Sequence, residues 1–471
     1  MEWKEQMVNQ LLDAVDLGYM NEETIGKFSY CHLAVLMEMT MQMENGKEFY
    51  LKIKSYLENI NLHRLRKQDK ITVGFIANYS STWIGDGLYQ LLEKSERFEP
   101  YVFLISNHNG QSEELIKEEY RQNLKFFRER NLWVVQTLDL NTGKQYTWEE
   151  MGIKPEVCIW LTPWIDLFRE HFYLLNYSLD TLHTYIPYGF MIAENENENF
   201  VYHQYNQYIH NMAWMNFEES QVAVDMAKKY AFVGDSNAVY TGYPKMDAFY
   251  EKLDEEEYIW NKLLQKVGNP KAKKIIWAPH HTLDEQEPVH FSTFAANYML
   301  MLELAEKYQN ETVWVVKPHP QLKYKAIKAG IFSDVNEWNT YEQRWRNLKN
   351  AEIMDEGMYD RLFKDSDAMI LDSVSFLAEY LYVHKPLLLL RRTGQFFNDF
   401  GKELVKIHYS ADGADGCAIE EFVINVVLKE NDEKREERER FFENNLDYKK
   451  MGGRNAAENI YAQLAMELKS D

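Results

Sequence analysis

Apolar residues follow two different patterns along the chain. Up to residue 70 they recur at the spacing of helix turns, as at Leu11, Leu12 and Val15, and no strand pattern interrupts them. From Ile71 the pattern changes to a β-branched run, ITVGFIA, which is followed by polar residues. The sequence therefore predicts an α/β region after a helical segment over residues 1–70. That segment could serve as an oligomer contact, a membrane-facing patch or a cap on the next domain.

Short apolar runs then alternate with helical segments in two successive series. The first series predicts strands over residues 71–77, 101–105, 132–135, 157–161, 185–187 and 230–233, and the second over 274–278, 312–316, 351–354, 368–371 and 386–390. This alternation predicts βαβ units and parallel sheets in two facing Rossmann-like domains, with the active site beside the carboxyl ends of the strands. The predicted organisation is a helical segment over 1–70, a first Rossmann-like domain over 71–250, a linker over 251–272 broken at Gly268, a second Rossmann-like domain over 273–430 and helices over 431–471.

Composition and charge exclude several classes of protein. The 471 residues include 52 basic and 74 acidic side chains, and the resulting charge of −22 disfavours a nucleic-acid partner, because binding phosphate backbones needs a basic face. The three cysteines, Cys31, Cys158 and Cys417, lie too far apart for a disulfide framework or a zinc knuckle and fit a reducing cytosol. There is no secretion signal and no run of about 18 apolar residues. We therefore expect a cytoplasmic protein that is soluble or peripheral on a membrane.

The most informative local pattern is a strand that ends in a rigid turn. The apolar run over 313–316 leads directly into Lys317-Pro318-His319-Pro320, where two prolines fix one lysine and one histidine. Lysine can neutralise a phosphate there, and histidine can donate a hydrogen bond to it or move a proton near neutral pH. The alternative is a surface turn with incidental charges, and we favour the functional interpretation.

The strand over 368–371 ends in the segment DSVS, which opens a predicted helix running to about Tyr382. Its Asp372 and Ser373 can cap that helix. The hydroxyls of Ser373 and Ser375 can also donate to a diphosphate at the helix N-terminus, where backbone N–H groups and the helix dipole favour an anion. Capping and diphosphate binding are compatible.

A third strand end carries Pro279 followed by two adjacent histidines, His280 and His281. Adjacent residues point in different directions, so the two histidines are not expected to share a metal ion, and we predict a phosphate- or acceptor-facing role and no metal site, with a structural role as the alternative. Two other patterns are discounted. The DSD segment at 365–367 precedes its strand and indicates a helix-to-strand turn, and the GDG segment at 85–87 lacks the third glycine of a dinucleotide-binding loop.

Taken together, these segments resemble the CDP-glycerol glycerophosphotransferases, which build teichoic acids and related surface polymers on the GT-B fold. The resemblance covers about residues 155–400, with the segments in the same order. The matching segments are TGYPKMD from Thr241, WAP from Trp277, KPHP from Lys317, DSVS from Asp372, and the acidic residues Asp367 and Glu379.

The resemblance implies a transferase that moves glycerol phosphate, or a related polyol phosphate, from a CDP-activated donor to a hydroxyl of a surface polymer or lipid-linked acceptor, releasing CMP. It places the acceptor side in the first Rossmann-like domain and the donor side in the second, and it implies no cofactor. The family histidine of the lysine-x-histidine-proline motif corresponds to His319, and Glu379 stands where an aspartate is usual. The implied donor-binding residues are Lys317, Asp372, Ser373, Ser375, Glu379, Pro279 and Gly242.

Two departures from the family pattern affect the choice of catalytic base. The family's Pro-His-Gly turn has Tyr188 in place of the histidine, and tyrosine, with a pKa near ~10, is a poor base at neutral pH. The family's Ala-Pro-Thr-Trp-Arg run here continues with two histidines after the proline, so an arginine is missing and His280 or His281 can replace the lost base. The candidate catalytic residues are His319, His280, His281 and Tyr188.

Two alternatives stay open beside this reading. One is a GT-B glycosyltransferase that uses a nucleotide sugar for capsule or surface polysaccharide, and the other is a catalytically reduced subunit that binds nucleotide and assists assembly. An oligomer is open in each case. A lipid-linked acceptor would bring the protein to the inner face of the cell membrane, where basic residues at 64–67 and 391–392 could each contribute ~1 kcal/mol, or could be ordinary solvated charges.

Overall fold

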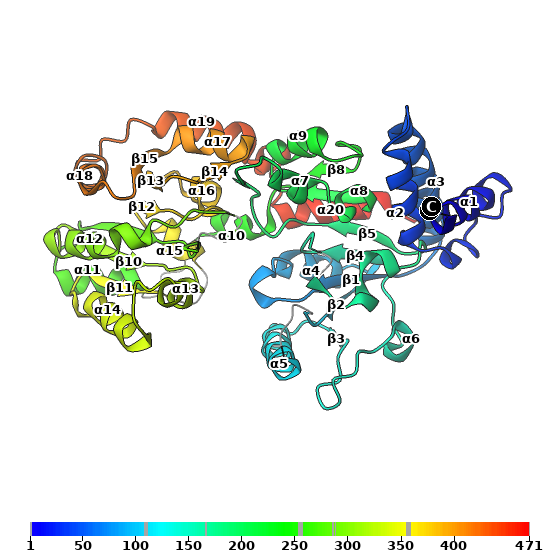
Figure 1. The fold of residues 1–471 in the computed structure, drawn as a ribbon, viewed down its shortest axis with the longest axis horizontal. Helices are drawn as coiled ribbons and strands as arrows, with labels where there is room; N and C mark the ends of the chain where they lie inside the picture. Colours follow the sequence, from blue (N-terminus) through cyan, green and yellow to red (C-terminus); the bar gives the residue numbers. More distant parts are fainter. Residues whose placement is uncertain are drawn as a thin grey trace. The chain divides into compact units, whose positions relative to one another are not determined.

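Two parallel β-sheets, one in each of two units, organise the chain (Figure 1). The structure is a computed structural model, and it describes residues 2–107, 112–164, 167–252, 258–284, 287, 289–354 and 359–470. The first unit comprises residues 1–189, 202–245 and 448–471, and the second comprises residues 190–201 and 246–447. This architecture confirms the predicted α/β class with parallel sheets.

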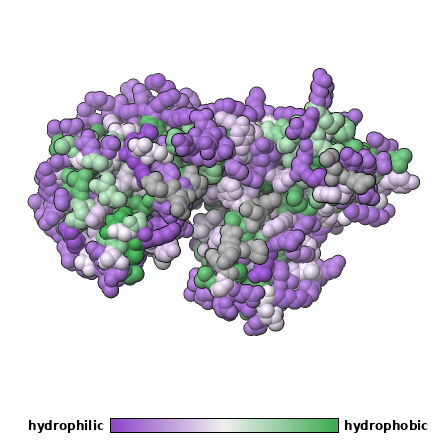
Figure 2. Space-filling view, in the orientation of Figure 1, coloured by the Kyte–Doolittle hydropathy of each residue, from purple (hydrophilic) through white to green (hydrophobic). Residues whose placement is uncertain are grey.

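The surface seen in Figure 2 is mostly hydrophilic, in line with the net charge of −22. Large exposed apolar side chains include Trp3, Leu17, Tyr19 and Met43, all in the N-terminal helical segment. Among the described residues, no helix combines the length and the apolar character needed to cross a lipid bilayer.

The predicted N-terminal helices are present as α1 (Glu2–Asp16), α2 (Tyr30–Thr40) and α3 (Gly46–Arg66). Their buried residues, such as Leu36 and Tyr50, pack in one cluster with Phe103 and Trp160 of the first sheet. Burying apolar side chains in this way is the main stabilising contribution to folding. The helical segment therefore caps one face of the first sheet, which is one of the three roles that the sequence left open.

The first sheet has the strand order β3-β2-β1-β4-β5-β7-β8, and every pair in it is parallel. Parallel neighbours place their carboxyl ends at the same edge. The strands are β1 (Ile71–Ala77), β2 (Phe98–Leu104), β3 (Val134–Gln136), β4 (Val157–Trp160), β5 (Leu182–Tyr185), β7 (Met215–Glu218) and β8 (Ala238–Tyr240).

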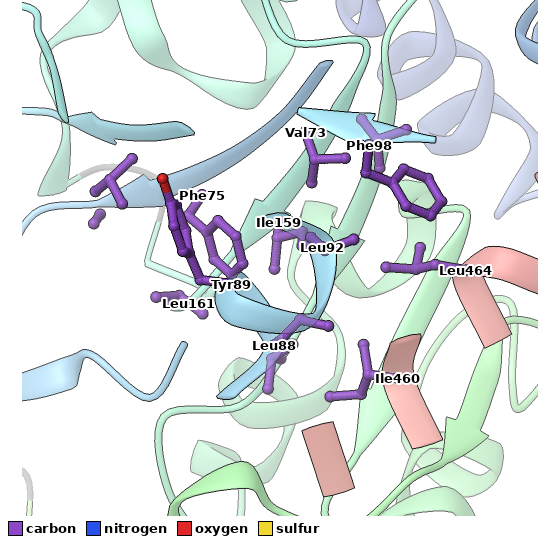
Figure 3. Close-up of a cluster of buried hydrophobic side chains, with 14 of the residues drawn as sticks. Val73, Phe75, Leu88, Tyr89, Leu92, Phe98, Ile159, Leu161, Ile460 and Leu464 are labelled. Carbon is purple, nitrogen blue, oxygen red and sulfur yellow. The ribbon is translucent and has the colours of Figure 1, made fainter. Parts of the chain in front are cut away.

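The other face of the first sheet has a core built from segments far apart in the sequence. Val73 and Phe75 of β1 pack with Leu88 of α4 (Asp86–Glu93) and with Ile460 of α20 (Ala456–Glu467) (Figure 3). The sequence predicted helices over residues 431–471. Of these, α20 belongs to the first unit, whereas α19 (Arg435–Asn445) belongs to the second.

The second sheet has the order β11-β10-β9-β12-β13-β15 and is also parallel throughout. Its core gathers large aromatic side chains, among them Trp277, Phe294 and Trp345. The strands are β9 (Lys273–Ala278), β10 (Thr312–Val316), β11 (Ala351–Ile353), β12 (Ala368–Leu371), β13 (Leu387–Arg391) and β15 (Tyr409–Asp412), and a short antiparallel pair joins β6 (Ala193–Glu194) to β14 (Phe396–Phe397).

One predicted strand is wrong, and another is displaced, because β5 shares only Tyr185 with the predicted strand over 185–187. Residues 230–233 are the end of α9 (Gln221–Tyr230) and a turn, not a strand. The backbone N–H groups of the apolar residues after α9 are bound by side-chain amides and not by a neighbouring strand. The Asn206 side chain accepts the Phe232 N–H (2.8 Å), and the Asn211 side chain accepts the Val233 N–H (3.1 Å).

The strands β7, β8 and β15 were not predicted, because polar residues such as Asn216 interrupt their apolar pattern. In the predicted linker, α11 (Ile259–Val267) ends at Gly268, whose φ of 75° is the expected break. The acidic stretch over residues 253–257 lies outside the described residues.

Gly242 offers a direct test of packing at the end of the first sheet. Its φ is +87°, and a Cβ there would lie 2.2 Å from the Tyr448 ring. We expect Gly242→Ala to combine a left-handed backbone penalty of roughly 1–2 kcal/mol with about 1–3 kcal/mol of overpacking, seen as a clear fall in Tm by scanning calorimetry. Gly152→Ala in the same unit is the control, because its φ of +69° is similar and nothing lies within 4 Å. Equal losses in the two variants would contradict this account.

Candidate functional site

The carboxyl ends of β9, β10 and β12 gather the chemistry that the sequence singled out. The three strands are neighbours in the second sheet, so the turns after them meet at one edge. Two backbone hydrogen bonds fix these turns: the Lys317 N–H donates to the Trp277 carbonyl (2.8 Å) and the His319 N–H donates to the Pro279 carbonyl (3.1 Å). Pro279 thus positions His319 through its carbonyl oxygen.

His280, His281 and His319 form one cluster at this edge. The His281 and His319 rings stack with centroids 3.9 Å apart, and the His280 centroid lies 4.4 Å from that of His281 and 5.4 Å from that of His319. The expectation that the adjacent histidines point in different directions is therefore wrong. The turn after β9 places both rings against His319, since the backbone bond from His319 to Pro279 draws the two loops together.

The hydrogen bonds of two of these rings define which nitrogen carries the proton. The Thr282 N–H donates to Nδ1 of His280 (3.4 Å), and the Gln321 N–H donates to Nδ1 of His319 (3.2 Å). A backbone N–H can only donate, so each Nδ1 accepts, and a neutral imidazole then carries its proton on Nε2. His280 and His319 are therefore arranged as Nε2–H donors.

Burial keeps the three imidazoles neutral. Burial, and after it His281 and His319, hold the pKa of His280 well below its usual range, and burial also lowers the pKa of His281. Burial, followed by His281 and then Lys317, lowers the pKa of His319 to about 3. At neutral pH the cluster supplies uncharged hydrogen-bond donors, with positive charge beside it from Lys317, which follows β10, and from Lys325.

The donor set fits an anion better than a metal ion. Within the described ranges, one nitrogen from each of these three histidines lies within 4.8 Å of the others, close enough in distance alone to share an ion. A metal needs the unprotonated nitrogen, however, and in His280 and His319 that nitrogen already accepts a backbone N–H. The remaining Nε2–H groups point to phosphate oxygens as partners.

Asp372 is the buried acceptor that holds the site's backbone. Its carboxylate accepts the His280 N–H (2.5 Å), the Thr293 N–H and the Thr293 hydroxyl (2.8 Å). Burial outweighs these donors and raises the pKa of Asp372 to about 6. At the other end of β12, Asp367 accepts the Lys274 N–H (2.8 Å) in the turn between α15 (Asp360–Lys364) and the strand, as expected for a helix-to-strand turn.

The segment after Asp372 forms a shorter helix than expected. Ser373 and Ser375 are half-buried, and the α-helix that follows, α16 (Phe376–Glu379), has only four residues before a 3₁₀ turn over Tyr380–Val383. Glu379 is buried and accepts the Tyr359 hydroxyl. The two serines stand at the same edge as the histidines, but no long helix backs them with its dipole.

A cavity of about 380 Å³ adjoins this edge in the second unit. It is lined in part by Ser292, Thr293, Arg391 and Arg392, and the Ser292 hydroxyl donates to the His280 carbonyl (2.7 Å). The arginine pair that the sequence offered as a membrane contact thus lines a cavity whose wall residue Ser292 is hydrogen-bonded to the His280 backbone.

Two of the predicted site residues, Tyr188 and Gly242, lie in the first unit. The Tyr188 hydroxyl accepts a hydrogen bond from Trp164 Nε1 (3.2 Å), and burial raises the pKa of Tyr188. The left-handed φ of Gly242 and the close Tyr448 ring leave no room for a side chain at this position. Backbone geometry and packing therefore account for the glycine without a ligand.

A pair of buried acids was not singled out from the sequence. Glu218 ends β7 and Glu219 follows it, and both are almost fully buried. Burial raises the pKa of Glu218, and burial together with Glu218 raises the pKa of Glu219 well above its usual range. The available signal was weak: the acidic pair follows Met215-Asn216-Phe217, in which Asn216 interrupts the apolar pattern.

One protein-family model matches this chain by sequence. A sequence model described as CDP-Glycerol:Poly(glycerophosphate) glycerophosphotransferase matches residues 191–462, which is more than half of the chain. No curated protein matches the chain by sequence.

Solved structures show the same fold at low sequence identity. The wall teichoic acid polymerase TagF is similar with a TM-score of 0.54 at 12% identity, covering 90% of this chain and 95% of that one, and a variant of it has been soaked with CDPG. The UDP-GlcNAc 2-epimerase from Neisseria meningitidis, bound to UDP-GlcNAc, is similar with a TM-score of 0.51 at 14% identity, covering 84% of this chain and 100% of that one. The two sheet-bearing units therefore have the GT-B fold, which by itself does not specify an activity.

Asp372 and Asp367 form a matched pair for testing the site. Each accepts one backbone N–H of the β9 segment, at opposite ends of β12, so we expect either change to asparagine to destabilise the protein by about 1–3 kcal/mol. Only Asp372→Asn should also weaken binding of inorganic pyrophosphate, by about tenfold or more in calorimetric titration, because only Asp372 positions His280. Equal pyrophosphate affinity in the two variants would argue against an anion site here.

The low pKa of His319 predicts a specific loss of stability in acid. The unfolded chain takes up a proton near pH 6.5 that folded His319 does not accept until about pH 3, so stability falls as the pH is lowered through this window. Between pH 7 and pH 5 the wild type should lose up to about 2 kcal/mol more than His319→Gln, measured by urea denaturation. The same loss in both proteins would mean that His319 is not shielded as described.

Proposed function

The chain belongs to the CDP-glycerol:poly(glycerophosphate) glycerophosphotransferase family, and from this membership we propose that it moves glycerol phosphate, or a related polyol phosphate, from a CDP-activated donor to a hydroxyl of a cell-surface polymer or lipid-linked acceptor. It is a glycerophosphotransferase-like transferase on the GT-B fold. The finer parts of the proposal are the donor, the acceptor and the release of CMP.

The cluster of neutral histidines beside Lys317 carries this proposal. His280 and His319 present Nε2–H donors at the carboxyl end of a parallel sheet, which is where α/β folds bind their ligands. Neutral donors combined with one lysine suit a diphosphate, whose oxygens need hydrogen bonds and partial neutralisation of charge. We propose that Lys317, Ser373 and Ser375 complete the donor site, with Pro279, Asp372 and Glu379 positioning it.

In the proposed reaction the acceptor oxygen attacks the phosphorus that bears the glycerol. The bond from that phosphorus to the bridging oxygen breaks, and CMP leaves with the electron pair. Negative charge then grows on the leaving phosphate, and His319 Nε2–H and Lys317 are placed to stabilise it. Preorganised donors in a partly dry site are worth more than the same donors in water, because they need no reorientation during the reaction.

We propose further that the first unit serves the acceptor and that the protein acts in the cytoplasm on teichoic-acid or capsule polymers. Association with the inner face of the membrane and an oligomeric state remain predictions. The basic segment at 64–67 gives little support to a membrane contact, because Arg64 pairs with Glu156 (2.9 Å) and Lys67 pairs with Glu22 (2.8 Å). Paired charges attract anionic lipid less than free ones.

The donor is tested by incubating the protein with CDP-glycerol, CDP-ribitol and UDP-sugars while following thermal stability and nucleotide release. Stabilisation by CDP compounds with release of CMP supports the proposal. Release of a nucleoside diphosphate would instead identify a glycosyltransferase, and binding without turnover would identify a catalytically reduced assembly subunit.

His319→Ala should lower turnover by about 10²–10⁴-fold, since it removes a donor to the leaving phosphate, while the melting temperature changes little. Tyr188→Phe is the control in the first unit, and it should keep most of the activity if the Tyr188 hydroxyl only accepts from Trp164. A folded His319→Ala protein with normal turnover would overturn this mechanism and direct attention to His280 or His281.

A further inference from the structure

The second unit holds a cavity of about 380 Å³ that the proposed transfer step does not use. Its lining residues all belong to the second unit. They come mainly from the start of α12 (Phe294–Lys307), the ends of β13 and β15, and the segment after α13 (Leu322–Lys328). Small-molecule sites commonly have volumes of about 300–1,000 Å³, so this cavity is large enough for a ligand.

Two adjacent arginines line the cavity, Arg391 at the end of β13 and Arg392 directly after it. The Arg391 Nε–H donates to the Gln395 side chain (2.9 Å), and Gln395 is itself held by two backbone carbonyls (both 2.9 Å). Arg392 donates to the Ser292 carbonyl (3.2 Å). A guanidinium has five N–H donors, so Arg391, anchored through Nε, can still offer its terminal NH₂ groups to a ligand.

The charge of the lining favours an anion. Among the residues that the structure describes, half-buried Arg391 pairs with no carboxylate, and burial lowers its pKa with no neighbouring acid to offset the effect. One acid, Asp412 at the end of β15, also lines the cavity, and one of its carboxylate oxygens accepts the Ala414 N–H (2.8 Å). The lining therefore carries two positive charges and one negative charge. A half-buried arginine without an acidic partner is stabilised when a ligand brings the missing negative charge.

The start of α12 adds to the effect of the arginines. Thr293, the N-cap residue, makes no side-chain cap bond, and no acidic residue lies in the first turn. Ala295 and Ala296 of that turn are exposed and line the cavity. The backbone N–H groups of a first turn and the helix dipole favour an anion, so they support a site that the two arginines define.

A chain of hydrogen bonds holds the cavity on the same frame as the histidine edge. The Thr293 hydroxyl donates to Asp372 (2.8 Å) and accepts from the Asn297 side chain (2.8 Å). Asn297 also donates to the Gly413 carbonyl (3.2 Å), and the Gly413 N–H donates to the Arg391 carbonyl (2.8 Å). The cavity is therefore preformed, which lowers the cost of binding a ligand.

We propose that this cavity binds a polyol phosphate unit of the acceptor chain, with Arg391 and Arg392 on its phosphate and Asp412 on a hydroxyl. Guanidinium groups match phosphate oxygens in pairs, and a carboxylate accepts hydrogen bonds from alcohols. Leu283 and Ile331 give the cavity an apolar wall for the carbon atoms of the polyol. The site holds a unit away from the reacting end, so it favours acceptors that already carry phosphate. The identity of the ligand rests on the proposed function, whereas the site rests on the cavity and its charges.

The test is a calorimetric titration of the full chain with a synthetic glycerol phosphate oligomer, in the absence of a CDP donor. Arg391→Gln should weaken oligomer binding by about 10–100-fold, because it removes charged hydrogen bonds to phosphate. Arg391→Lys keeps the charge and should lose less. Ala296→Trp fills the cavity from an exposed position and should weaken binding without any change to the arginines. In each variant CDP-glycerol should still raise the melting temperature as in the wild type.

Arg440→Gln is the matched control. It removes the same charge from an exposed position on α19 of the same unit, so oligomer affinity should not change. Equal oligomer affinity in the wild type, Arg391→Gln and Ala296→Trp would overturn this inference and leave the proposed function standing. Loss of stabilisation by CDP-glycerol in Arg391→Gln would assign the arginine to the donor site and also overturn it.

Two further probes identify the ligand. Inorganic phosphate that binds as tightly as the oligomer would indicate a general anion site and overturn the assignment to a polyol phosphate. Binding to phosphatidylglycerol vesicles that depends on Arg391, without binding of the oligomer, would assign the site to a lipid headgroup and overturn the assignment to the acceptor chain. A wild type that binds the oligomer through Arg391 but releases no CMP from CDP-glycerol would support the site and overturn the proposed function.

Discussion

One buried carboxylate sets the geometry of the second unit's ligand edge. Asp372 receives donors from the turn after β9 and from Thr293, at the start of α12 (Phe294–Lys307), so a single side chain joins three segments that are distant in sequence. The His280 backbone is placed by this contact, and the His280 ring then packs against His281 and His319. An ionised group in such a buried place is tolerated because three donors compensate for its lost hydration.

The neutral state of the histidines follows from the same burial. Imidazolium ions this close would repel one another in a medium of low dielectric constant, and this repulsion adds to the burial that lowers the pKa of each ring. Fixing Nδ1 as acceptor in two of the rings leaves the outward nitrogens as donors with a definite direction. The second unit thus presents neutral hydrogen-bond donors at the carboxyl edge of its sheet.

Much of the ligand edge of the second unit could be predicted from sequence, because an apolar run followed by polar residues marks the end of a strand in a parallel sheet. That signal located Lys317, His319, Asp372 and both adjacent histidines. It failed for β7, whose alternating polar residues are buried by neighbouring side chains that no local pattern reveals, and Glu218 was missed with it. The contact among the three histidines depends on a backbone bond between loops about 40 residues apart, and the short length of α16 depends on tertiary packing.

The path of the chain between the units has a consequence for biosynthesis. The sheet of the first unit is covered on one face by α20, which supplies Ile460 and Leu464 to its core after the whole second unit has been traversed (Figure 3). A ribosome therefore releases most of the second unit as a nearly continuous stretch before the first unit can close its core. Until α20 is made, the apolar strand faces that it covers stay exposed, which is a state prone to aggregation.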